Sequence, residues 1–90
     1  MNINKDEIIK KICYTELVYE RINKKLNIKL QKDEIEKMIT EIIEETDKTK
    51  FQKAGKNIYV TNNYRNVRLT INSQTNRIIT ADRLDNKTTK

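Results

Sequence analysis

The sequence predicts an α+β domain in which two N-terminal amphipathic helices pack on one face of an antiparallel β-meander of three or four strands. Two observations predict this fold. In the first half of the chain, apolar residues recur at three- and four-residue intervals, as they do on one face of a helix. After Lys48 the period falls to two, and β-branched residues alternate with polar ones, as in half-buried strands. A chain of 90 residues supports a single domain spanning 1–90, with a core over about 5–84 and a flexible tail at 85–90.

Two amphipathic helices are expected over residues 5–26 and 32–46. Asn4 followed by Glu7 forms a capping box, which marks the start of the first helix. Its buried stripe is predicted to contain Ile8, Ile9, Ile12, Cys13, Leu17, Val18, Ile22 and Leu26. The second stripe is Ile35, Met38, Ile39, Ile42 and Ile43. Cys13 is therefore expected to be a small buried hydrophobe.

Three strands are expected over residues 58–61, 65–72 and 77–84, with a further strand around 50–53. Asn62-Asn63 is interpreted as a two-residue turn, because Asn tolerates the left-handed conformation that such hairpins need. Ile58 would then oppose Val67. In that register the core face of the sheet collects Ile58, Val60, Val67, Leu69 and Ile71.

The loop at residues 73–76 decides which way the last strand faces. With an even-numbered loop, Ile71 opposes Ile78. The outer face then collects Tyr59, Tyr64, Arg68, Arg77, Ile79 and Arg83. A three-residue loop would instead turn Ile78 outward and Arg77 and Arg83 inward.

The charge of the chain is concentrated in its second half. Residues 1–45 carry nine basic and ten acidic side chains, whereas residues 46–90 carry ten basic and three acidic ones. No acid occurs between Asp47 and Asp82. The positive electrostatic field of this half favours nucleic acid or an acidic protein surface as partner.

The candidate binding site is the basic and aromatic sheet face. Its residues are Tyr59, Tyr64, Arg68, Arg77, Arg83 and, in the preceding turn, Lys56. Aromatic rings beside guanidinium groups stack bases and follow phosphates in single-strand binding proteins. An ordinary solvated sheet face is the competing interpretation, since Tyr and Thr suit any pleated surface.

Several kinds of chemistry have no support in the residues. Histidine is absent and Cys13 is the only cysteine, so we expect no catalytic residue, no metal site, no disulfide and no cofactor. The acids Glu41, Glu44, Glu45 and Asp47 are better explained as a solvated helix face than as a cation site. Asp82 and Arg83 are the one adjacent acid and base in the last strand, where an ion pair is the simplest interpretation.

No membrane span and no secretory signal are expected, which favours a cytoplasmic location.

Four stretches resemble an uncharacterised bacterial family of the kind filed as a domain of unknown function. They are residues 11–16 (KICYTE), 55–62 (GKNIYVTN), 68–73 (RLTINS) and 77–84 (RIITADRL), within a likeness that covers about 9–86. The resemblance brings no activity and no site residues. The order of helices and meander is also similar, at the level of architecture alone, to RelE- and barnase-like toxin ribonucleases.

Three functions are expected to compete. The first is a small basic, non-enzymatic binding module that engages nucleic acid or a complex that handles it, as phage and mobile-element inhibitors such as anti-CRISPR proteins of low-GC bacteria do. The second is a ribonuclease of the toxin type, which would have to use Arg, Lys and Tyr. The third is a structural or self-assembling protein, with a homodimer as its simplest form.

Overall fold

The computed structural model describes residues 4–84 and places three α-helices before a four-stranded sheet in that range. The helices are α1 (Lys5–Lys11), α2 (Glu16–Leu26) and α3 (Lys32–Glu45), and a short 3₁₀ helix, η1 (Lys48–Lys50), leads into the sheet. The strands are β1 (Phe51–Ala54), β2 (Asn57–Asn62), β3 (Val67–Asn72) and β4 (Ile78–Arg83). The predicted α+β fold is confirmed, and the further strand expected near residues 50–53 is β1. The tail expected at 85–90 lies outside the described residues.

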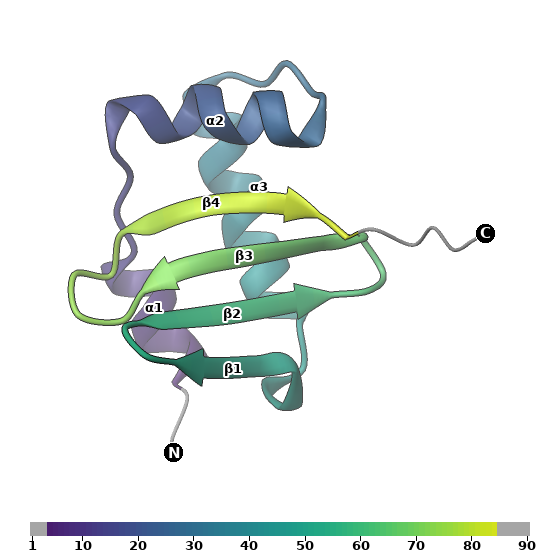
Figure 1. Ribbon diagram of the computed structural model, residues 1–90. Coiled ribbons are helices and arrows are strands. Elements are labelled where there is room, and N and C mark those ends of the chain that lie inside the picture. Colours follow the sequence, from purple (N-terminus) through teal and green to yellow (C-terminus); the bar gives the residue numbers. More distant parts are fainter. Residues whose placement is uncertain (1–3, 85–90) are drawn as a thin grey trace.

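The sheet is an antiparallel meander with the strand order β1-β2-β3-β4. Figure 1 shows α3 and α1 behind the sheet, while α2 runs alongside β4 at one edge. Within residues 4–84, no helix crosses the opposite face, which is turned to the viewer in Figure 1. We call this the outer face. No helix in the same range is long and apolar enough to cross a membrane.

The segment predicted as one helix over residues 5–26 is broken between α1 and α2. In the break, the N–H of Cys13 donates to the carbonyl of Asn76 at 2.9 Å, and the carbonyl of Cys13 accepts from the N–H of Ile78 at 3.0 Å. These two bonds form a short parallel bridge to the start of β4. They replace the helical hydrogen bonds that a continuous helix would have made, so the chain restarts as α2 in a new direction.

The break also changes which side chains are buried. The prediction of a buried Cys13 and a buried Leu17 is wrong, because both are exposed, Leu17 at 75 %. The rest of the predicted stripes lies in or against the core. The buried core consists of Ile8, Val18, Ile22, Leu26, Ile35, Ile39, Ile42, Ile43, Phe51, Ile58, Val60, Val67, Leu69, Ile71, Ile78 and Ala81.

The hairpin between β2 and β3 differs from the predicted two-residue turn. Ile58 pairs with Ile71 and Asn62 pairs with Val67, so a four-residue loop, 63–66, joins the strands. Asn66, with φ 61°, is the residue of this loop in the left-handed region. The pairing is displaced by four residues from the prediction, and an even displacement keeps every side chain on its face. The predicted core face is therefore confirmed although the predicted partners were wrong.

The hairpin between β3 and β4 contains a β-bulge. Ile71 pairs with Ile78 as predicted for an even-numbered loop, but Thr70 pairs with Thr80. One extra residue, Ile79, is thus accommodated in β4, and the faces of the following residues are exchanged. The placement of Arg83 on the outer face is consequently wrong.

Candidate functional site

Tyr59 and Arg68 form the centre of the outer face. They come from the neighbouring strands β2 and β3, where each is adjacent to core-facing residues and therefore points away from the helices. The guanidinium carbon of Arg68 lies over the Tyr59 ring, 5.5 Å from its centroid. This is a cation–π contact, and it holds a planar cation on an aromatic surface. Two of the predicted site residues are thus brought together.

Beside Arg68 lies an acid, Asp82, which contacts a lysine that the sequence did not indicate. Asp82 of β4 pairs across the strands with Arg68 on the outer face. The carboxylate of Asp82 also lies 3.2 Å from the Nζ of Lys25, which comes from α2. Lys25 therefore adds a cation to this surface. No local pattern predicts it, because it depends on how α2 lies along the edge of β4.

Lys56 and Arg77 lie together at one end of the sheet. Ser73, which begins the β3–β4 turn, donates to the carbonyl of Lys56 through both its N–H, at 2.7 Å, and its Oγ, at 2.9 Å. These bonds tie that turn to the β1–β2 turn. Arg77 directly precedes the core-facing Ile78, so strand alternation directs it to the outer side. Lys56 and Arg77 are both exposed.

The other two predicted site residues are elsewhere. Tyr64 lies in the 63–66 loop at the opposite end of the sheet and is 94 % exposed. Arg83 faces the helices because of the bulge, and its Nη2 donates to the carbonyl of Leu26 at the end of α2. Arg83 therefore caps a helix C-terminus and does not belong to the outer face. Asp82 and Arg83 consequently lie on opposite faces, and the predicted ion pair between them does not form.

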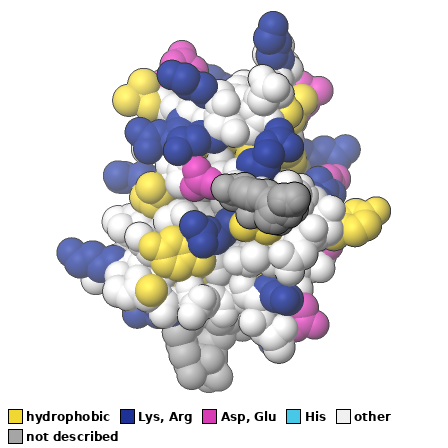
Figure 2. Space-filling model, turned by 45° about the vertical axis from the view of Figure 1, so that its right-hand side comes forward, with side chains coloured by type: hydrophobic (Ala, Val, Ile, Leu, Met, Phe, Trp, Pro, Cys, Tyr) yellow, Lys and Arg dark blue, Asp and Glu magenta, His cyan; other side chains and the backbone are white. Residues whose placement is uncertain are grey.

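Further lysines surround β1, a group that the prediction of the site omitted apart from Lys56. Their pattern was visible in the sequence, because the lysines fall within nine consecutive positions after Asp47. We call this group the β1 lysines: Lys48, Lys50, Lys53 and Lys56. All four are exposed. Figure 2, which brings the loop end of the sheet forward, shows basic side chains at several separate places with hydrophobic and acidic ones between them.

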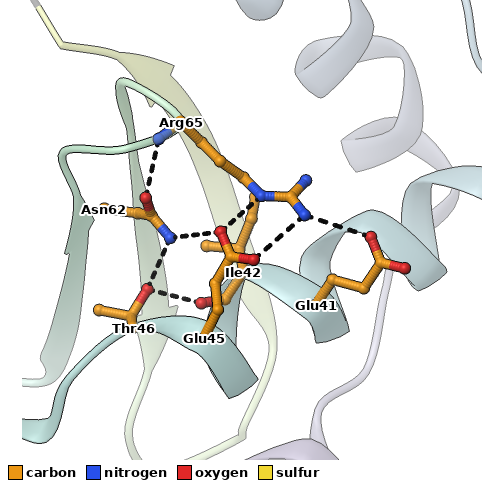
Figure 3. A network of polar contacts seen from close by, with 6 residues as sticks. All are labelled: Glu41, Ile42, Glu45, Thr46, Asn62 and Arg65. Atoms are coloured by element: carbon orange, nitrogen blue, oxygen red, sulfur yellow. Dashed lines mark hydrogen bonds and ion pairs between the residues drawn. The ribbon is translucent and has the colours of Figure 1, made fainter.

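The acidic end of α3 belongs to a polar network that joins it to the sheet (Figure 3). Arg65 donates from Nε to Glu45 at 2.6 Å and from Nη2 to Glu41 at 3.3 Å. Asn62, 5 % exposed, donates to Glu45 and to the hydroxyl of Thr46, each at 3.0 Å, and accepts from the N–H of Arg65 at 2.8 Å. The carboxylates are therefore partners of an arginine. No three acidic or cysteine side chains within residues 4–84 gather closely enough to hold a metal ion.

A second titratable group lies between α2 and α3. The rings of Tyr14 and Tyr19 stack with centroids 5.5 Å apart, and the hydroxyl of Tyr19 donates to Glu36 at 2.6 Å. Burial, followed by this hydrogen bond and the charge of Glu36, raises the pKa of Tyr19 to about 12. Burial and the same carboxylate also raise the pKa of Tyr14. Both phenols stay protonated at neutral pH, so neither is an activated nucleophile or base.

Within residues 4–84, the protein is a small helix-and-meander domain whose outer sheet face carries a tyrosine in contact with an arginine. A family model described as "Protein of unknown function (DUF3781)" matches residues 6–82, and the chain therefore belongs to this family. The resemblance to an uncharacterised domain family is confirmed by this match. No curated protein and no solved structure matches the chain.

Proposed function

We propose that the protein is a non-enzymatic module that binds single-stranded nucleic acid on its outer face. The observation that carries the proposal is the contact of Arg68 with the Tyr59 ring, 5.5 Å from its centroid, on a sheet face that no helix of residues 4–84 covers. A guanidinium beside an aromatic ring offers flat surfaces on which a base stacks and a charge that a phosphate neutralises.

The surrounding cations extend this surface in two directions. Lys25 reaches it from α2, and Lys56 and Arg77 stand at the turn end of the sheet. A strand that crosses the face from Arg68 toward these turns passes Tyr59 and Thr70 and reaches the cations Lys56 and Arg77 at its far end. Asp82 is the one acid placed beside Arg68 by strand pairing, and Lys25 lies within ion-pair distance of it. The net field over this route is therefore positive.

The proposal is tested with a fluorescent single-stranded oligonucleotide of mixed sequence, whose anisotropy is followed at several salt concentrations. Affinity is expected to fall with salt by a slope of roughly 0.7 per neutralised phosphate. Arg68→Glu with Arg77→Glu should weaken binding by about tenfold or more, a loss of about 1.4 kcal/mol. The matched control is Arg21→Glu with Lys24→Glu on the exposed side of α2, which changes the net charge equally. Equal losses in both pairs would refute a site on the outer face.

The ribonuclease alternative is separated from binding by turnover. The same protein is incubated with total RNA and with supercoiled DNA, and no cleavage is expected. Cleavage that disappears in Arg68→Ala or Tyr64→Phe, with the fold retained, would replace the binding proposal by the ribonuclease one. If the oligonucleotide does not bind at low salt, the proposal of a nucleic-acid partner is wrong.

A further inference from the structure

The β4 edge of the sheet is covered by other segments of the chain, whereas the β1 edge is open within residues 4–84. At the β4 edge, Cys13 supplies two backbone hydrogen bonds, and α2 runs alongside the strand (Figure 1). At the β1 edge, no segment within residues 4–84 pairs with the side of β1 that faces away from β2. An uncovered edge strand presents backbone donors and acceptors to any extended chain that approaches it.

The turn that joins β1 to β2 determines which groups point to this open edge. Ala54 pairs with Asn57 across a two-residue turn in which Gly55 has a φ of 62°. In such a hairpin the closing pair exchanges its hydrogen bonds, and the next residue back directs its own groups the other way. The N–H and C=O of Lys53 therefore point toward the open edge. A strand that added here would hydrogen-bond to Lys53.

The charges around this edge indicate what kind of chain fits. The β1 lysines border it, and Asp47 is the one acid in residues 47–56. A second copy of the protein paired through the same edge would place these lysines against each other, which is unfavourable. An extended acidic segment satisfies the backbone groups and the lysines at once.

We propose that β1 binds an extended acidic segment of a partner protein, which joins the sheet as an additional strand. This inference goes beyond the proposed nucleic-acid binding, since it uses the edge of the sheet in place of the outer face. Failure of the nucleic-acid proposal would not contradict strand addition at β1, and the reverse also holds. Lysines on an edge also discourage aggregation, and that role alone is one of the outcomes that the test separates.

The probe is a synthetic peptide of about eight residues, a usual strand length, that alternates valine and glutamate. The control peptide has the same sequence with every backbone nitrogen methylated, so that it keeps the charge and loses the donors of the ladder. With the full 90-residue protein, the unmodified peptide is expected to bind and to protect the amide of Lys53 from hydrogen exchange. The methylated peptide should bind about tenfold or more weakly and should protect no β1 amide.

Two protein variants test the charge and the backbone separately. Lys50→Glu with Lys53→Glu should abolish peptide binding, whereas Lys24→Glu with Lys29→Glu, which alters the net charge equally, should leave it within about twofold. Lys53→Pro should also abolish binding while the circular dichroism spectrum is kept, since proline is tolerated where an edge N–H faces solvent.

Three results would overturn the inference. Equal binding of the methylated peptide would show electrostatic adsorption without strand addition. Absence of peptide binding would mean that the β1 lysines only keep the edge from pairing with other strands. Protection of the β1 amides by a single-stranded oligonucleotide, with no protection by the peptide, would assign this edge to nucleic acid.

Discussion

Asn62 is expected to stabilise the polar network at the end of α3 more than Arg65 does. Asn62 is 5 % exposed and makes three of the contacts in Figure 3, whereas the Arg65 side chain is 32 % exposed. Asn62→Ala leaves the buried hydroxyl of Thr46 without one of its hydrogen bonds and should lower the free energy of unfolding by about 1 to 3 kcal/mol. Arg65→Ala breaks solvent-screened pairs and should cost about 1 kcal/mol or less. Urea denaturation of both variants measures the order, and the reverse order would contradict this interpretation.

Glu45 should make the stability of the protein depend on pH in the acid range. The hydrogen bond from Arg65, followed by that from Asn62, lowers the pKa of Glu45. A carboxylate whose pKa is lowered on folding stabilises the native state above its unfolded pKa, about 4.3, and this contribution is lost as the pH falls through the folded pKa. The free energy of unfolding should therefore fall between about pH 5 and about pH 3.

Glu45→Gln is the variant that isolates this effect. Its stability should fall less steeply over the same pH range, because the amide does not titrate. Some dependence should remain, since hydrogen bonds from Thr49 also lower the pKa of Asp47. Denaturant titrations at several pH values compare the two proteins. Parallel curves would show that the Glu45 contact contributes nothing to the pH dependence.

At the scale of single elements, β3 is buried along most of its length, whereas α2 contributes only one of its faces to the core. Leu69 in β3 is 0 % exposed, whereas Leu17 in α2 is 75 % exposed. Leu69→Ala should lower the free energy of unfolding by about 2 to 5 kcal/mol, because it leaves a cavity. Leu17→Ala should change it by about 0.5 kcal/mol at most. Thermal and urea denaturation test the pair, and similar losses would place Leu17 in the core.

At the scale of the whole molecule, the uneven distribution of charge is expected to keep the open β1 edge from pairing with itself. Lys50→Thr with Lys53→Thr removes two cations from that edge and introduces side chains that favour strands. We expect these substitutions to increase self-association at low salt, as measured by sedimentation velocity. Lys24→Thr with Lys29→Thr serves as the control, with the same change in net charge. Unchanged sedimentation of the β1 variant would show that the lysines do not protect this edge.

The sequence alone determined the types of the elements, most of their boundaries and the core face of the sheet. Ile58, Val60 and Leu69 alternate with polar residues, and this period of two assigns them to one face whatever their exact partners are. For the same reason Tyr59 and Arg68 were predicted correctly to share the outer face, although the predicted register did not give their contact. The excess of lysine after Asp47 was equally readable, because charge is a property of the chain and not of its fold.

The tertiary structure decided what depends on contacts between distant segments. The bonds of Cys13 to Asn76 and Ile78 broke the first helix, although its apolar spacing continues through the break. The bulge at Ile79 turned Arg83 toward Leu26, and the position of α2 brought Lys25 to Asp82. Local periodicity carries no information on these pairings, because each is selected by the packing of whole elements. The composition of the site therefore required the fold.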